Sequence, residues 1–184
     1  MGYRSRAGPP FRRSHGFDAM TASYPRRSLL VVHIGTSVGF MGAVAVFFCL
    51  AVAGLLAGND ASAKAFYAVM PTVTWWVVVP LAFASIAVGL LQAALSPWGL
   101  VRHYWVVVKL AMTALITAVL MMQTPSIDEL GLIAASPEAM TGDIGARYSV
   151  LVHSGAGIAA LAVVLVLSVV KPRGLTGWSV RRTS

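Results

Sequence analysis

The sequence is poor in charge and in cysteine, and each shortage excludes a class of protein. Charged residues make up 11% of the 184 positions, whereas soluble domains contain about 25%. A single cysteine, Cys49, excludes an intrachain disulfide and a metal site built from several cysteines. The chain also lacks a phosphate-binding glycine loop and the ligand spacing of a zinc site. Nothing in the sequence therefore indicates a nucleotide-binding or zinc-dependent protein.

Acidic residues are missing from every long apolar segment. Four of the six acids lie together in residues 123–148, and none interrupts an apolar run. Such runs therefore hold no carboxylate for a proton relay or an acid–base pair. Ser154 directly follows His153, but neighbours on a helix point about 100° apart and cannot act as nucleophile and base. We expect a protein that is not an enzyme.

Hydrophobic residues dominate, at 58% of the chain, with a mean hydropathy of +0.78. Four apolar segments are long enough, at about 1.5 Å per residue, to cross a hydrocarbon core of roughly 30 Å. Because these runs are continuous rather than alternating, they favour helices over a β-barrel. The sequence predicts an all-α membrane protein, a four-helix up-and-down bundle. Its expected spans are residues 29–57, 73–95, 101–122 and 150–170.

Polar segments flank and connect this predicted membrane domain of residues 29–170. Residues 1–28 carry six arginines and are expected to be a disordered tail, and residues 171–184 form a second basic tail. We expect a loop between Gly58 and the second span, and a kink at Pro80. In the loop 123–148, Ser126 to Glu129 reads as a capping box for a separate short helix.

Lysine and arginine residues predict the orientation of the bundle. If the N-terminus is cytoplasmic, twelve basic residues fall on that side and two, Lys64 and Arg147, on the other. This asymmetry predicts that both termini are cytoplasmic. The net charge of +8 then reflects topology and contact with anionic lipids rather than nucleic-acid binding.

Three stretches carry a resemblance to a known family: WWVVVPLAFASIAVGLLQAALSPWGLVRHYWVVVKL, VLVHSGAG and KPRG. Together they resemble small bacterial four-helix integral membrane proteins that are catalogued as a domain of unknown function. The resemblance covers Leu29 to about Gly177, and PWGLVRHYWVVVK is its most specific part. It implies a four-helix protein of the bacterial cytoplasmic (inner) membrane, and it implies no particular activity.

Histidines are the first candidates for chemistry. His33 and His103 are expected at the cytoplasmic ends of their spans, where both could ligate one haem iron or metal ion. His153 is expected near the opposite face and is a weaker candidate. The alternative is that each histidine bonds to backbone, a neighbouring side chain or a lipid headgroup. No cofactor is the leading expectation, and haem b is the alternative.

Polar residues at a similar depth form a second candidate site. His33, Gln92, His103 and Lys109 share the cytoplasmic leaflet, and Arg102 lies beside them. Such residues usually face the bundle interior, and a cationic pocket there suits an anionic lipid headgroup or a small anion. The alternative is snorkelling to the headgroups combined with hydrogen bonds between helices. A stripe of small residues also predicts tight packing of the second span: Ala82, Ser85, Gly89 and Ala93.

The leading functional hypothesis is a polytopic integral membrane protein with a non-enzymatic structural or accessory role. Its expected partners are the lipid bilayer, including anionic lipids, and either a second copy or another membrane protein. The alternative is a haem- or metal-binding redox or transport protein that uses His33 and His103. A small-solute or anion permease is disfavoured, because the spans hold no acids and the subunit is small.

Overall fold

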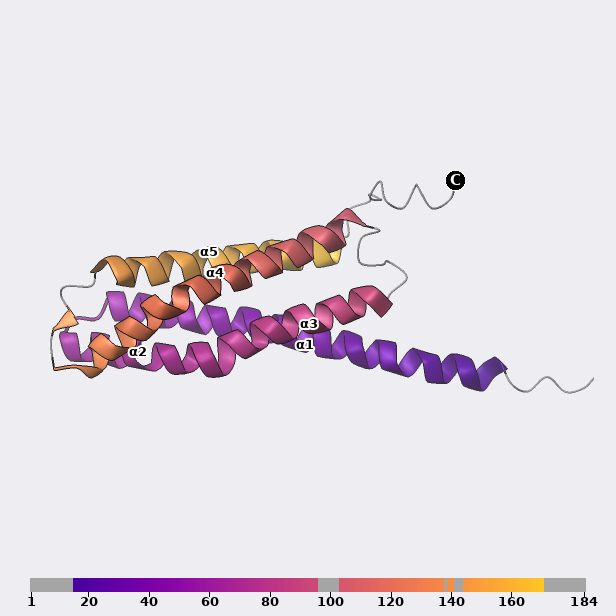
Figure 1. The fold of residues 1–184 in the computed structure, drawn as a ribbon, viewed down its shortest axis with the longest axis horizontal. Coiled ribbons are helices and arrows are strands. Elements are labelled where there is room, and N and C mark those ends of the chain that lie inside the picture. Colours follow the sequence, from indigo (N-terminus) through magenta and orange to yellow (C-terminus); the bar gives the residue numbers. More distant parts are fainter. Residues whose placement is uncertain (1–14, 96–102, 138, 141–143, 171–184) are drawn as a thin grey trace, which may run out of the picture.

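Four long helices pack as an antiparallel bundle in the computed structural model (Figure 1). The structure describes residues 15–95, 103–137, 139–140 and 144–170, with side chains from residue 27 onward. Helix α1 (His15–Leu55) is followed by a continuous helical segment composed of α2 (Asp60–Val73), the π-helical turn η1 (Thr74–Val78) and α3 (Val79–Leu95). Helices α4 (Tyr104–Ala135) and α5 (Ile144–Val170) complete the bundle. Both α1 and α4 pack against α3 and α5, which confirms the predicted all-α four-helix fold.

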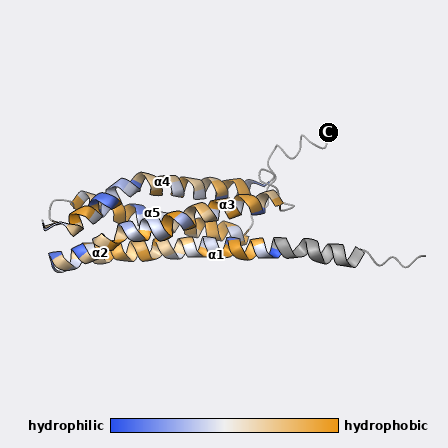
Figure 2. Cartoon of the chain, turned by 60° about the horizontal axis from the view of Figure 1, so that its bottom comes forward, coloured by the Kyte–Doolittle hydropathy of each residue, from blue (hydrophilic) through white to orange (hydrophobic). Residues whose placement is uncertain are grey.

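Each of the four helices is long and apolar enough to cross a membrane. In the most apolar stretch of each helix, at most 28% of the residues are buried inside the bundle. Large apolar side chains therefore face outward, among them Trp76 at 79% exposure and Leu115 at 65%. Figure 2 colours much of the length of these helices as hydrophobic. An outer surface of this kind suits lipid rather than water.

Helix α1 begins at His15, and its candidate membrane span, Arg27–Leu55, is close to the predicted span of residues 29–57. Residues 1–14 and 171–184 of the predicted tails lie outside the described residues. The loop expected after Gly58 is wrong, because α2 starts at Asp60. The Oδ1 atom of Asn59 accepts a hydrogen bond from the backbone N–H of Ser62 at 2.8 Å. Asn59 therefore caps a new helix.

Prolines distort these helices without ending them. The π-helical turn η1 lies just before Pro80, and after it the backbone N–H of Val79 bonds to the carbonyl of Thr74 five residues earlier. Pro125 lies inside α4, so the predicted separate helix after Ser126 is wrong. Proline cannot donate to the carbonyl four residues before it. The hydroxyl of Thr124 donates to that carbonyl, of Met121, at 2.9 Å instead.

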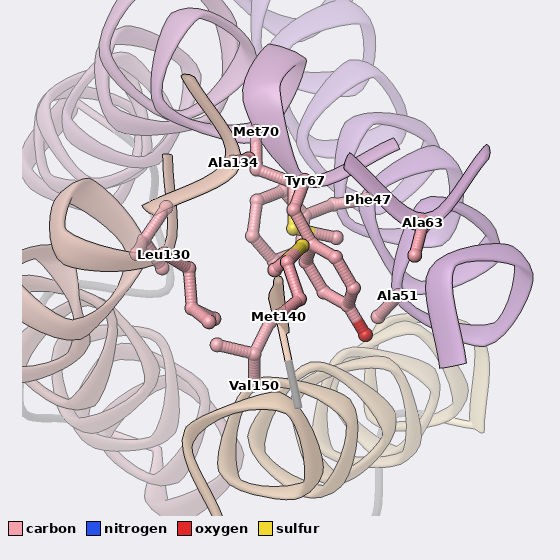
Figure 3. Packing of buried hydrophobic residues seen from close by; sticks show 10 residues of the cluster. Phe47, Ala51, Ala63, Tyr67, Met70, Leu130, Ala134, Met140 and Val150 are labelled. Carbon is pink, nitrogen blue, oxygen red and sulfur yellow. The ribbon is translucent and has the colours of Figure 1, made fainter. Parts of the chain in front are cut away.

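Buried side chains form two clusters along the bundle axis. The first surrounds Tyr67 at the α2 end of the bundle, and Figure 3 shows it gathered with Phe47, Met70 and Leu130. The second lies midway and is centred on Phe40 and Val78. Its remaining members are Val44, Ala82 and Leu161. Beyond this second cluster, toward the C-terminal end of α3, the helices line a cavity that is partly open to the outer surface.

Candidate functional site

A cavity of about 400 Å³ lies between α1, α3, α4 and α5. It occupies the end of the bundle at which α3 stops and α4 begins, and Figure 1 shows these two helices diverging toward that end. The volume falls within the range of about 300–1,000 Å³ that is typical of small-molecule sites. The cavity is therefore large enough to hold a small ligand inside an otherwise apolar bundle.

Each of the four helices contributes a polar side chain to the lining. Lys109 of α4 donates to the hydroxyl of Ser168 on α5, and its ammonium lies 5.7 Å from the centre of the Trp105 ring. The hydroxyls of Ser37 on α1 and Ser85 on α3 are 3.2 Å apart. The remaining polar lining residues are His33, Gln92 and Thr113.

Two polar atoms in this lining have unmet hydrogen-bonding capacity. Nδ1 of His33 and Oε1 of Gln92 are buried and make no hydrogen bond to any described residue. A buried polar atom without a partner costs about 1–3 kcal/mol. Native structures contain few such atoms, and each points to a partner such as water, an ion or a ligand. Their position beside a cavity makes the cavity the candidate site.

The lining changes from polar to apolar along the bundle axis. His33 and Phe40 on α1 are seven residues apart, which corresponds to roughly 10 Å along a helix. Ser168 and Leu161 on α5 have the same spacing, with the polar residue again nearer the end of the bundle. His33 and Ser168 therefore lie toward the outer end of the cavity, among apolar residues such as Leu30 and Leu165, and Phe40 and Leu161 border its inner end beside the second buried cluster.

The stripe of small residues brings α3 against α1 at this cavity. Ala82 and Ser85 are buried, as the sequence predicts for a packing face. A Cβ atom added at Gly89 would lie 3.2 Å from Cε1 of His33, which is tighter than usual contact. The absence of a side chain at Gly89 therefore makes room for the imidazole between the two helices.

The structure brings together only some of the predicted site residues. His33, Gln92 and Lys109 line the cavity, whereas His103 is not among its described lining residues. His103 lies at the N-cap of α4, with its ring 6.4 Å from that of Trp105. Arg102 lies outside the described residues. The binding roles of all of these residues stay predictions.

His153 lies apart from this cavity. Its side chain is exposed on α5, and Nδ1 donates to the backbone carbonyl of Ser149 at 2.7 Å. It borders a smaller cavity of about 60 Å³. Among the described residues, no group of three or more His, Cys, Asp or Glu side chains could hold a metal ion.

Sequence reasoning missed three serines of the site. Ser37, Ser85 and Ser168 each lie in an apolar helix. A serine there does not by itself predict a binding site, because its hydroxyl readily bonds to a carbonyl of the preceding turn. Ser85 was interpreted only as a small packing residue. The signal available for Ser168 is its place on the last turn of an apolar span, at the same end of the bundle as Lys109.

Comparison with protein-family models, with curated proteins and with solved structures finds no match for this chain. The structure shows the four-helix architecture that the family resemblance implies, and it assigns no family. In the part of the chain that the structure describes, this is a four-helix protein with four candidate membrane spans.

Proposed function

We propose that this chain is a multi-pass protein of the bacterial cytoplasmic membrane that binds a small amphiphilic ligand inside its helix bundle. The observation that carries the proposal is the cavity, with buried polar atoms of His33 and Gln92 at one end and apolar side chains at the other. Polar residues within membrane helices are costly and commonly mark binding sites. A ligand with a polar head and an apolar body matches both ends of this cavity.

The role we propose is accessory rather than catalytic. Of the described lining residues, none is a carboxylate. His33 is the one described histidine in the lining, and the hydroxyls of Ser37 and Ser85 are bonded to each other. The lining thus offers groups that bind and orient a ligand, and it offers no paired acid and base.

The haem alternative receives less support from this geometry. It needs His33 and His103 on one iron, and of these only His33 is among the described lining residues. A Soret band in the purified protein would favour the alternative over the proposal.

The distribution of Lys and Arg residues supports an orientation of the bundle in the membrane. The polar end of the cavity is the end at which α3 stops, α4 begins and α5 stops. In the four-span topology, twelve of the fourteen Lys and Arg residues belong to this side: the six before His33, then Arg102 and Lys109, and the four in residues 171–184. Under the positive-inside rule this end faces the cytoplasm. The ligand head would then lie at the depth of the cytoplasmic headgroups.

Lipid-dependent stability tests the proposal. Delipidated protein in detergent should unfold about 5–10 °C higher when a total lipid extract is restored, as expected for ligand near 100 times its Kd. Thr113→Phe should abolish most of this gain, because the ring fills the cavity. Leu115→Phe adds a ring to the lipid-facing surface and should keep the gain. Equal gains in both variants would show that lipid acts on the outer surface alone.

A further inference from the structure

We infer that the apolar part of the ligand is one acyl chain of a bilayer lipid, which enters the cavity sideways from the membrane between α1 and α5. This inference rests on the proposed function, because it requires that the cavity binds a ligand. It adds the chemical class of the apolar part and the route by which the ligand enters.

Helices α1 and α5 pack closely where α1 passes Val44 and Phe48. A Cβ atom added at Gly157 of α5 would lie 3.7 Å from Cγ1 of Val44, and one added at Gly155 would lie 3.2 Å from Cε2 of Phe48. The two glycines thus bring α5 directly against these α1 side chains. Val44 and Phe48 therefore mark the face of α1 that packs against α5.

The same face of α1 is uncovered nearer the start of its membrane span. Residues at alternating spacings of three and four lie on one side of a helix. One such stripe on α1 consists of Leu30, Ile34, Ser37, Met41, Val44 and Phe48. Leu30 and Ile34 line the cavity and are nevertheless 44% and 53% exposed. Helix α5 therefore covers this stripe at Val44 and Phe48 and leaves it open at Leu30 and Ile34.

Exposed residues of the described cavity lining come from α1 and α5. They are Leu30, Ile34 and Val38 on α1, and Leu165 on α5. The described lining residues of α3 and α4 are all buried or half-buried. Leu165 lies two turns beyond Gly157 on the same side of α5. A residue that lines the cavity and is also exposed marks the edge of an opening, so the cavity opens between α1 and α5.

Acyl chains are the molecules that this opening meets. Its four exposed residues are aliphatic and lie in the candidate membrane spans Arg27–Leu55 and Ile144–Val170, so the opening faces hydrocarbon. On α1 the lining extends from Leu30 to Met41, roughly 16 Å along the helix, and buried Phe40 and Leu161 close its inner end. This elongated shape suits a flexible chain. A volume of about 400 Å³ is near the lower end of the range for small-molecule sites, which favours one chain over two.

Photolabelling in liposomes tests this inference. The probe is a phosphatidylcholine that carries a diazirine within one acyl chain, and peptide mass spectrometry locates the adducts. In the wild-type protein, irradiation should attach the probe to Leu110 or Thr113, which line the cavity from α4. It should also label Leu115, which is exposed on the outer surface of α4.

Two valine variants of α1 separate the cavity from the outer surface. Val38→Trp places an indole at the opening and should remove the adducts at Leu110 and Thr113. Val46→Trp is the matched control, because Val46 is also exposed on α1 and is not among the described lining residues. This control should keep all adducts. Circular dichroism checks that each variant is folded, and Leu165→Trp, on the other side of the opening, should repeat the loss.

The outcomes distinguish the route, the acyl chain and the proposed function. Adducts at Leu110 and Thr113 that persist in both Val38→Trp and Leu165→Trp would overturn entry between α1 and α5. Labelling of wild-type protein at Leu115 without Leu110 or Thr113 would overturn the acyl chain. The proposed function would then still stand if lipid stabilises Thr113→Phe less than Leu115→Phe. Equal stabilisation of these two variants would remove the proposed function itself.

Discussion

Replacing Gly131 with alanine should destabilise the bundle strongly, because this position is the tightest glycine contact in the described part of the chain. An added Cβ would lie 2.3 Å from Cγ and 3.0 Å from Cδ of Pro71. The proline ring is tied to its own backbone and cannot rotate away as a flexible side chain would. The methyl group must therefore push α2 and α4 apart, next to the buried side chains of Met70 and Leu130.

We expect Gly131→Ala to lower the unfolding temperature by about 5 °C or more, from an overpacking cost of roughly 1–3 kcal/mol or above. Gly42→Ala is the matched control, because an added Cβ there meets nothing within 4 Å. Removing a glycine from a helix interior stabilises it by up to about 1 kcal/mol, so this control should melt at or slightly above the wild-type temperature. A Gly131→Ala protein as stable as the Gly42→Ala protein would contradict the packing of α2 against α4.

Arg147→Ala should produce the second large loss of stability. The guanidinium of Arg147 donates from Nη2 to the backbone carbonyl of Gly54 at 2.7 Å, and from Nε to the hydroxyl of Tyr67 at 3.2 Å. It also lies 5.1 Å from the centre of the Tyr67 ring. Gly54 belongs to the last turn of α1, where carbonyls lack partners within the helix. One side chain on α5 thus ties α1 and α2 together.

The expected cost of Arg147→Ala is roughly 3 kcal/mol, the sum of a charge-assisted hydrogen bond and a cation–π contact. Tyr67→Phe removes only the hydroxyl and should cost about 1 kcal/mol. The double variant should then lose less than the sum of the two single changes, because they remove a shared bond. Chemical denaturation in detergent of the wild type, the two single variants and the double variant measures the free energy of unfolding of each protein. Strictly additive losses would mean that Arg147 and Tyr67 do not interact.

Continuous apolar runs were enough to predict the four helices and the packing face of Ala82 and Ser85. Hydrocarbon-length segments have few alternatives to a helix, and small residues at three- and four-residue spacing define one face. The helical start at Asp60 was missed because Gly58 and Asn59 are typical turn residues. Only the hydrogen bond from Ser62 to Asn59 shows that Asn59 caps a helix.

The wrong boundary near Pro125 has a different cause. Proline commonly marks the end of a helix, and Ser126 to Glu129 matches a capping box. In the fold, Thr124 satisfies the carbonyl that Pro125 leaves unpaired. Asp128 accepts hydrogen bonds from Nε1 of Trp75 at 3.1 and 3.3 Å instead of capping a new helix. Contacts with α2 and η1 thus override the local signal, and a single sequence does not contain those contacts.

The candidate site was predictable in its depth and not in its shape. In the predicted spans, His33 and Gln92 stand four and three residues from the cytoplasmic end and Lys109 stands eight, so the sequence places all three in one leaflet. Whether their side chains meet depends on the rotation of each helix about its axis, which the weakly amphipathic spans leave open. Residues of four helices line the cavity, and no local sequence pattern encodes how far apart those helices lie.

Cysteine accessibility in whole cells tests the central claim, a four-span bundle with cytoplasmic termini, most directly. Cys49 is the single native cysteine, so Cys49→Ala gives a cysteine-free parent. Into it we would place Ala61→Cys, Ser96→Cys, Ala135→Cys or Ser179→Cys, one at a time. A membrane-impermeant maleimide should label the cysteines at positions 61 and 135 in intact spheroplasts, and those at 96 and 179 only after lysis. Labelling at position 96 before lysis would contradict the four-span topology and, with it, the cytoplasmic position of the cavity.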